Sequence, residues 1–413
     1  MQQQDLIHDW NTAPSNESTA SRPAVLMLDD ETLRDGLQSP SVVDPPIEAK
    51  IEILHLMNEL GIDTADVGLP GAGPRAVADV GALCREIADS KLRIQANCAA
   101  RTVIRDVEPI VEISQQTGLE VEACLFIGSS PIRQYAEGWD EDFLVKQSAE
   151  ALRFAVAAGL PVMYVTEDTS RARPETIRRL YGEAVRLGVQ RVCVTDTVGH
   201  ATPSGVARLV RFVRQVLDEA GGQEVGIDWH GHRDRGMGLA NNLEAFRAGA
   251  TRVHGCGLGI GERCGNAEID LLLVNMKLLG WIDRDLTKLA DYCRAVSEAT
   301  GVPIPNNYPV IGSDAFETAT GVHAAAVIKA YRKGDDWLAD RIYSGVTAGD
   351  FGFRQRIRIG PMSGRSNVIF WLEERGIEPT QERVDRIFES AKGSDRLLED
   401  DEIRGLIEST TEA

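Results

Sequence analysis

Eight short apolar segments recur between residues 24 and 254, and a stretch of helical periodicity follows each of them. The segments are continuously apolar, as expected for strands of a parallel sheet that is covered on both faces. In one of the stretches between them, Ile47, Ile51, Leu54 and Met57 recur at helical spacing. We expect strands at residues 24–28, 64–67, 92–96, 123–127, 162–165, 192–195, 225–229 and 252–254.

Eight βα units of this length predict an α/β fold, a TIM (β/α)8 barrel over residues 24–282. A doubly wound sheet would need fewer strands and a glycine-rich turn after the first strand to receive a pyrophosphate. The turn after the first strand here is acidic and reads DDETLRDG over residues 29–36. The sequence therefore favours the barrel.

The βα alternation stops after about residue 280. A helical stretch at 286–299 leads into a connection rich in proline and asparagine at 302–309, and charged helical segments follow. We expect a smaller, mainly helical C-terminal region, divided into a helical linker subdomain at 283–345 and a small subdomain at 346–413. Residues 1–23 are polar and lack an apolar core, which predicts a flexible leader and neither a secretion signal nor a transit peptide.

The charge balance excludes some classes of partner. Asp and Glu number 63 against 44 Lys and Arg, a formal charge of -19 that repels nucleic acid and anionic membranes. No window approaches the roughly 18 apolar residues of a membrane span. The seven cysteines form no CxxC pair, which indicates a reducing compartment and no thiolate zinc site. We therefore expect a cytoplasmic protein with no nucleic-acid or membrane partner.

The segment His230-Gly231-His232 follows the seventh expected strand. Residues two apart in an extended chain point to the same side, so both imidazoles can reach one ion. The first and seventh strands of a closed barrel open onto the same mouth, which lets Asp35 add a carboxylate oxygen. Two nitrogens and an oxygen suit Mn, Zn, Co or Fe, and a set with open positions tolerates Mg. The alternatives are a hydrogen-bonded pair of histidines, and an ion pair that Arg34 and Asp35 form with a neighbouring loop.

Other expected strands also end in polar segments. They are TED at 166–168, DTVGH at 196–200 and GLGIGER at 257–263. A strand-end carboxylate is often a helix cap, and a glycine-rich segment is often only a tight turn. Their joint occurrence at one barrel mouth indicates a functional site.

Five motifs together carry a resemblance to a known family. They are DETLRDGLQSP at 30–40, DTVG at 196–199, HGHRD at 230–234, GIGERCGN at 259–266 and TGVH at 320–323. The chain resembles the DRE-TIM metallolyase superfamily, and within it the 2-isopropylmalate, homocitrate and citramalate synthases. The motifs span most of residues 24–330.

This resemblance implies a divalent metal cation (Mg, Mn, Zn or Co) held by Asp35, His230 and His232, with Asn266 close to it. The implied reaction is a Claisen-type condensation. An acyl-CoA, usually acetyl-CoA, is deprotonated at its methyl carbon and adds to the ketone of a 2-oxo acid, and the thioester is then hydrolysed. Thr197 would hydrogen-bond the substrate carboxylate.

The resemblance also suggests which charged side chains act on the substrates. Arg34 supplies fixed positive charge beside the developing alkoxide. Glu167 and His323 are the acid and base candidates. In the family this histidine comes from the C-terminal region of the partner chain, which implies a domain-exchanged homodimer, whereas the plain alternative is a helix-surface histidine. Arg101 and Arg133 are candidates for binding anionic groups.

Three positions depart from the family pattern. Arg233 stands where the family usually has Asn, Asp66 replaces the Glu usual before G-x-P, and Cys124 stands where many isopropylmalate synthases carry His. The first two would reshape the substrate pocket, and the last indicates something other than an ordinary isopropylmalate synthase. The chain ends about 90 residues after His323, so we expect no leucine-sensing regulatory domain.

The sequence favours an acyl-CoA:2-oxo acid condensing enzyme, an acyltransferase of amino-acid-biosynthesis type that forms a 2-alkylmalate or a homocitrate-like product. The alternative is a carbon–carbon lyase of the same superfamily, of the hydroxymethylglutaryl-CoA lyase or aldolase type. Such a thioester lyase is expected to carry a Gly-Gly-Cys-Pro type of loop after the last strand, whereas GERCGN at 261–266 has the synthase form. A non-enzymatic scaffold would have lost ligands, and here all of them are present.

Overall fold

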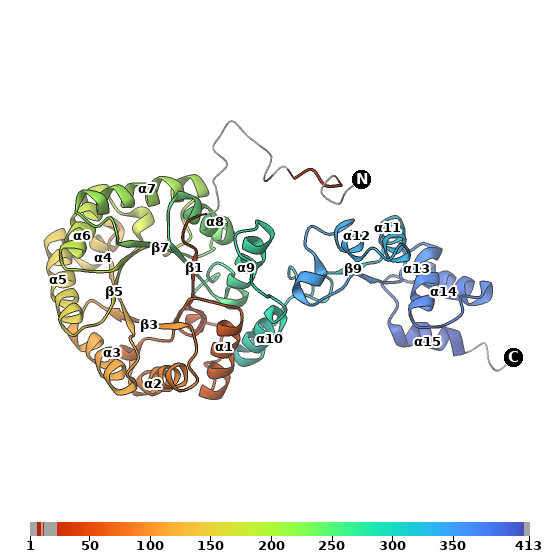
Figure 1. The fold of residues 1–413 in the computed structure, drawn as a ribbon, viewed down its shortest axis with the longest axis horizontal. Coiled ribbons are helices and arrows are strands. Elements are labelled where there is room, and N and C mark those ends of the chain that lie inside the picture. Colours follow the sequence, from red (N-terminus) through yellow and green to blue (C-terminus); the bar gives the residue numbers. More distant parts are fainter. Residues whose placement is uncertain (1–5, 10, 12–22, 409–413) are drawn as a thin grey trace. The chain divides into compact units, whose positions relative to one another are not determined.

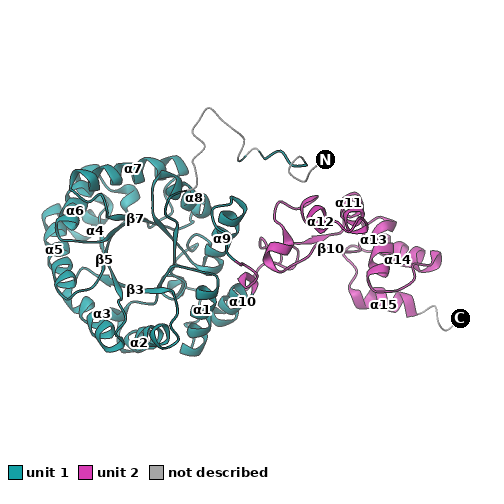
Figure 2. Cartoon of the chain, in the orientation of Figure 1, with its two compact units in different colours: residues 1–284, 291–302 teal, residues 285–290, 303–413 magenta. Residues whose placement is uncertain are grey.

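The computed structural model describes residues 6–9, 11 and 23–408. The leader expected at residues 1–23 lies almost wholly outside them. The chain divides into two compact units (Figure 2). Unit 1 comprises residues 1–284 and 291–302, and unit 2 comprises residues 285–290 and 303–413.

Unit 1 is a closed barrel of eight parallel strands, in the order β1 to β8, with β1 pairing to both β2 and β8. This confirms the predicted TIM barrel, which Figure 1 shows as a ring of strands inside a ring of helices. The strands are β1 Met27–Asp30, β2 Thr64–Asp66, β3 Gln95–Arg101, β4 Glu122–Gly128, β5 Val162–Glu167, β6 Arg191–Asp196, β7 Gly226–Gly231 and β8 Arg252–Gly255.

Helices of unit 1 follow the strands and cover the outside of the barrel. Pro74, Pro174 and Pro203 each occupy a first helical turn, where proline's missing N–H costs no hydrogen bond. The helices are α1 Ile47–Glu59, α2 Pro74–Asp89, α3 Ile104–Thr117, α4 Pro131–Glu137, α5 Glu141–Ala157, α6 Pro174–Arg186, α7 Pro203–Glu219, α8 Gly238–Ala248, α9 Ile269–Leu278 and α10 Leu289–Thr300, whose first two residues belong to unit 2.

The third strand lies later than the sequence predicted, because β3 begins at Gln95 and not at residue 92. Leu92 closes the preceding helix instead, since its N–H donates to the carbonyl of Ile87 at 3.0 Å. Ile94 is buried directly before the strand. The strand itself reads QANCAAR, and its small residues give a weaker apolar signal than the residues that precede it.

The barrel interior below the mouth contains buried charges. Arg252 on β8 donates to Asp228 on β7 at 2.5 Å and to Glu122 on β4 at 2.6 Å. Buried charges of this kind persist only where they are paired and hydrogen-bonded. These ion pairs lie inside the barrel, beneath the residues that line the mouth.

Unit 2 is mainly helical, as predicted, with one two-stranded parallel sheet of β9 Glu317–Thr318 and β10 Arg356–Ile357. Its core contains two hydrophobic clusters, one around Trp371 and one around Val327. Its helices are α11 Gly321–Arg332, α12 Asp336–Arg341, α13 Arg365–Glu374, α14 Gln381–Gly393 and α15 Asp400–Glu408. Among the described residues of both units, no helix has the length and apolar character needed to cross a membrane.

Candidate active site

A cavity of about 230 Å³ opens at the carboxyl ends of the barrel strands. Its lining contains Arg34 and Asp35 after β1, Glu167 at the end of β5, and both histidines of β7 and its following turn. Catalytic sites of TIM barrels lie at this end of the strands. The structure therefore brings most of the predicted site residues of unit 1 to the expected place.

Asp35, His230 and His232 converge on one point of this cavity. The Nε2 atoms of His230 and His232 lie 3.8 and 3.9 Å from Oδ2 of Asp35. These separations are too long for hydrogen bonds, but two ligands that each lie about 2.1 Å from a shared ion are up to about 4.2 Å apart. The three residues form one of two groups in the described chain with the spacing of a metal site.

The pKa values of Asp35 and His232 also suit a cation. Burial opposes the charge on Asp35, but the neighbouring Arg34 and His230 outweigh it and hold the pKa of Asp35 below its usual value. Burial and the adjacent His230 lower the pKa of His232 to about 4. Metal binding requires an ionised carboxylate and neutral imidazoles, so a lowered pKa at both residues favours the ligating forms.

Asn266 lies beside this group, as the family resemblance implied. Its Nδ2 donates to Oδ1 of Asp35 at 3.0 Å, while its Oδ1 is buried with no hydrogen-bond partner in the described part of the chain. A buried amide oxygen without a partner is costly, and a nearby cation would relieve that cost. Gly261 permits this close approach, because a Cβ on its backbone (φ +145°) would collide with the Asn266 amide.

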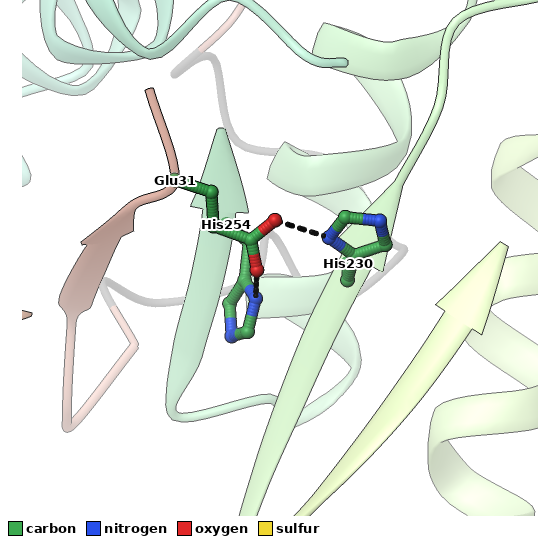
Figure 3. A group of neighbouring side chains, drawn as sticks. All are labelled: Glu31, His230 and His254. Carbon is green, nitrogen blue, oxygen red and sulfur yellow. Dashed lines mark hydrogen bonds and ion pairs between the residues drawn. The ribbon is translucent and has the colours of Figure 1, made fainter. Parts of the chain in front are cut away.

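Behind His230 lies a series of ion pairs and hydrogen bonds that no sequence motif indicated (Figure 3). Nδ1 of His230 is 2.9 Å from Oε2 of Glu31, and Oε1 of Glu31 is 2.6 Å from Nδ1 of His254. His254 reaches Asp228 through Nε2 at 2.9 Å. Glu31, His230 and His254 are the second group with metal-site spacing, and in this structure the two rings contact the two oxygens of Glu31 directly.

The contact with Glu31 determines which ring nitrogen of His230 is free to bind a metal. A histidine that donates Nδ1–H to a carboxylate presents its Nε2 lone pair to a metal, and Nε2 is the atom that faces Asp35. Burial opposes charge on His254, but Asp29 and Glu31 outweigh it and raise its pKa to about 10. The sequence offered one signal, a histidine at the carboxyl end of the last strand.

Arg34 is held by three carboxylates. Its guanidinium lies 2.9 Å from Glu31, 2.8 Å from Asp35 and 2.7 Å from Asp66. Arg34 therefore does form ion pairs, as the structural alternative expected. These ion pairs hold its guanidinium inside the cavity, beside Asp35.

Glu167 and Thr197 line the same cavity. Burial raises the pKa of Glu167 despite the neighbouring Arg133, which makes its carboxylate a stronger base than an exposed one. The Thr197 hydroxyl accepts the N–H of Asp168 at 2.8 Å, so it joins the ends of β5 and β6.

Arg101 and Arg133 line an adjacent cavity of about 270 Å³, which shares Phe126 and Glu167 with the first. Arg101 donates to Asp106 at 2.5 Å. Arg133 lies 3.1 Å from Glu137. Neither arginine lines the first cavity among the described residues.

His323 lies in unit 2, exposed near the start of α11. Its ring stacks on Tyr343, with 4.3 Å between the centroids. No sequence motif indicated Tyr343. The catalytic role of His323 stays a prediction.

The three departures from the family pattern have structural partners. Arg233 forms an ion pair with Glu268 and donates to the carbonyl of Cys264 at 2.8 Å, so it anchors the loop after β8. Asp66 holds Arg34, and Cys124 lines the cavity.

Comparisons with known proteins agree with this geometry. The chain is 33% identical over 376 residues to the homocitrate synthase AksA of Methanopyrus kandleri, a match covering 90% of this chain and 88% of the relative. It is 32% identical over 373 residues to a protein of the same organism named as a probable 2-isopropylmalate synthase, covering 90% and 70%.

The solved HMG-CoA lyase of Bacillus subtilis is similar in fold alone. It has a TM-score of 0.55 and 21% identity, over 69% of this chain and 96% of that one. A family model described as HMGL-like matches residues 26–296. The motifs, the relatives and this match agree that the chain belongs to the HMGL-like family, together with the homocitrate and 2-isopropylmalate synthases.

Proposed function

We propose that this chain is an acyltransferase that condenses an acyl-CoA, usually acetyl-CoA, with a 2-oxo acid and releases free CoA. The observation that carries the proposal is the convergence of Asp35, His230 and His232 on one point, with Arg34 and Glu167 in the same cavity. The names of the two relatives, both synthases, support the same reaction class.

A divalent cation of the Mg, Mn, Zn or Co type would be held by Asp35, His230 and His232, with Asn266 beside it. Bound there, it would act as a Lewis acid on the carbonyl of the 2-oxo acid.

The protein's own side chains supply the proton transfers. Glu167 removes a proton from the thioester methyl group, and the resulting carbanion forms a bond to the ketone carbon of the 2-oxo acid. The ketone oxygen becomes a hydroxyl group by taking up a proton, which His323 would donate. Water then cleaves the thioester to a carboxylate and free CoA. Arg34 stabilises the developing negative charge through its fixed guanidinium.

Binding of the two anionic substrates uses different parts of the mouth. Thr197 hydrogen-bonds the carboxylate of the 2-oxo acid from the cavity wall. Arg101 and Arg133 attract anionic groups of the acyl-CoA in the adjacent cavity, which shares Glu167 with the first. With the two substrates in these two cavities, Glu167 would lie between them.

We also infer that the protein acts as a homodimer with exchanged C-terminal regions, in which His323 of one chain completes the site of the other. The exposure of His323, stacked on Tyr343, supports this inference. All seven cysteines are free, which supports a reducing compartment such as the cytoplasm.

The test is thiol release from acetyl-CoA, followed with each of a series of 2-oxo acids. We expect release to depend on both a 2-oxo acid and a divalent metal, to stop with a chelator and to return when metal is added back. Mass spectrometry of the product should show the 2-oxo acid plus an acetyl unit. Thiol release that ignores every 2-oxo acid, or cleavage of a hydroxymethylglutaryl thioester, would point to the lyase or a hydrolase instead.

A further inference from the structure

The cavity at the barrel mouth has a polar side and an apolar side. The polar side carries the Asp35, His230 and His232 group together with Arg34. The apolar side comes from four neighbouring strands, β3 to β6. Its residues are Ala99, Cys124, Phe126, Met163, Val165 and Cys193.

The strand register stacks these apolar residues in two layers. Cys124 on β4 pairs with Met163 on β5 in the lower layer. Phe126 pairs with Val165, and Val165 pairs with Cys193, one step nearer the mouth. Cys124, Met163 and Cys193 form a buried cluster against which Val165 packs. A substrate group that points away from the metal ligands therefore meets an apolar wall.

The cavity has no spare cation for a second carboxylate of the substrate. Arg34 carries the one guanidinium or ammonium group among the described residues of the lining, and it is already bound to three carboxylates. The His254 ring also lines the cavity, but it is bound to Glu31 at 2.6 Å and to Asp228 at 2.9 Å. Glu167 and Glu262 add further negative charge to the same lining. An additional anion buried here would lose its hydration without gaining a partner.

The charges around the apolar wall do not change this conclusion. Arg252 lies below the wall, with Nη2 3.3 Å from Sδ of Met163, but it is 2% exposed and bound to Asp228 and Glu122. The arginines of the adjacent cavity line a different space. A carboxylate at the apolar wall is therefore without a free counter-ion.

We propose that the acceptor is a monocarboxylic 2-oxo acid with an apolar side chain, and that Cys124, Met163, Val165 and Cys193 select it. This inference rests on the proposed condensation and narrows its product to a 2-alkylmalate. Homocitrate, a tricarboxylate, requires a dicarboxylic 2-oxo acid. The 2-oxo acid that this chain accepts therefore differs from the one that a homocitrate-forming enzyme uses.

The sharpest test compares two acceptors of nearly the same shape. Oxaloacetate and 2-oxo-4-methylpentanoate differ at the end of the side chain, where a carboxylate replaces an isopropyl group. We expect kcat/KM, measured by thiol release from acetyl-CoA with the metal-loaded enzyme, to favour 2-oxo-4-methylpentanoate by at least about 100-fold. A pocket of this kind rejects an added hydroxyl by about that factor, and a charge is harder to bury. Calorimetric titration of each acid without acetyl-CoA should show the same order of binding.

A pair of variants tests the assignment of the wall. Val165→Arg introduces the missing cation, and Val165→Met adds length without charge. We expect the ratio of kcat/KM for oxaloacetate to that for 2-oxo-4-methylpentanoate to be at least about ten-fold higher in V165R than in V165M. The ratio cancels any loss of activity that affects both acceptors equally.

The outcomes separate this inference from the proposed function. Wild-type kcat/KM for oxaloacetate or 2-oxoglutarate equal to or above that of every apolar acceptor would overturn the inference and leave the condensation intact. No thiol release with pyruvate, 2-oxoisovalerate, 2-oxo-4-methylpentanoate or either dicarboxylic acid would overturn both. Equal ratios in V165R and V165M would remove Val165 from the selecting wall.

Discussion

At the scale of single residues, the site depends on which atom each histidine presents. Glu31 fixes Nδ1 of His230 and leaves Nε2 to face Asp35 at 3.8 Å. His232 reaches the same carboxylate from two residues further on. Three donors from two strand ends therefore meet without any direct hydrogen bond between a histidine and Asp35.

Removal of one donor tests the metal site. We expect His232→Ala to weaken Mn²⁺ binding, measured by calorimetric titration, by at least about 100-fold, because loss of an outer-shell partner already costs 10–100-fold in metal affinity. Turnover should be abolished. His55→Ala is the matched control, since His55 is a surface histidine paired with Glu86. Unchanged Mn²⁺ affinity in the H232A protein would dismiss the site assignment.

The buried His254 predicts a pH-dependent stability. Its folded-state pKa of about 10 lies above the ordinary value of 6.5, so the protonated ring stabilises the fold fully below about pH 6.5, and the contribution is lost as the pH rises towards 10. We expect His254→Gln to lower the free energy of unfolding by about 3–5 kcal/mol at pH 6, as for other broken buried ion pairs.

The gap between H254Q and wild type should narrow between pH 7 and pH 10, measured by urea denaturation of the metal-free proteins. The surface variant His55→Gln serves as the control. A gap that stays constant or widens with pH would show that folding does not raise the pKa of His254.

At the scale of elements, the loop after β8 borders one side of the site. His232 and Asn266 form an isolated antiparallel bridge, and Arg233 binds the same loop through Glu268. Gly261 allows the loop to pass close to Asp35, since its missing Cβ would lie 3.3 Å from Oδ1 of that residue.

We therefore expect Gly261→Ala to lower Mn²⁺ affinity by about 10–100-fold, because the added methyl group displaces Asn266 from its place beside the ligand carboxylate. Gly138→Ala is the control. Its φ of +68° is also positive, but its Cβ would meet open space, so it should cost only about 1–2 kcal/mol of stability and no metal affinity. Equal metal affinity in G261A and wild type would refute this account of the loop.

The strands and loops also show which parts of the structure could be predicted from the sequence. The count and period of apolar segments predicted the barrel, and the shared mouth of the first and seventh strands placed Asp35 near His230 and His232. The contact of His254 with Glu31 was not predictable in this way, because it depends on the register that pairs His254 with Asp29. The start of β3 was also misplaced, since small residues such as Ala96 and Ala99 make a weak strand signal.

At the scale of the whole molecule, the two units carry different parts of the proposed chemistry. Unit 1 holds the cavity with Glu167, and unit 2 holds His323. The chain has a net charge of -19, and both proposed substrates are anions, so attraction must come from local cations at the mouth and not from the overall field.

The proposed exchange between two chains leads to a complementation experiment. Glu167→Gln and His323→Ala should each be inactive alone. In randomly assembled symmetric dimers of the two variants, half of the dimers are mixed. If each site takes Glu167 from one chain and His323 from the other, one site in each mixed dimer is intact, and co-expression restores about a quarter of wild-type activity.

A second mixture supplies the control, because in it shared sites give lower activity than sites built by a single chain. Wild-type chains co-expressed with equal amounts of the double variant E167Q/H323A should retain about a quarter of wild-type activity if the sites are shared between chains, and about half if each chain builds its own site. Analytical ultracentrifugation establishes that the mixtures are dimeric. Activity of about half in this mixture, with none restored in the first, would place Glu167 and His323 of one site in the same chain and end the proposal of exchange.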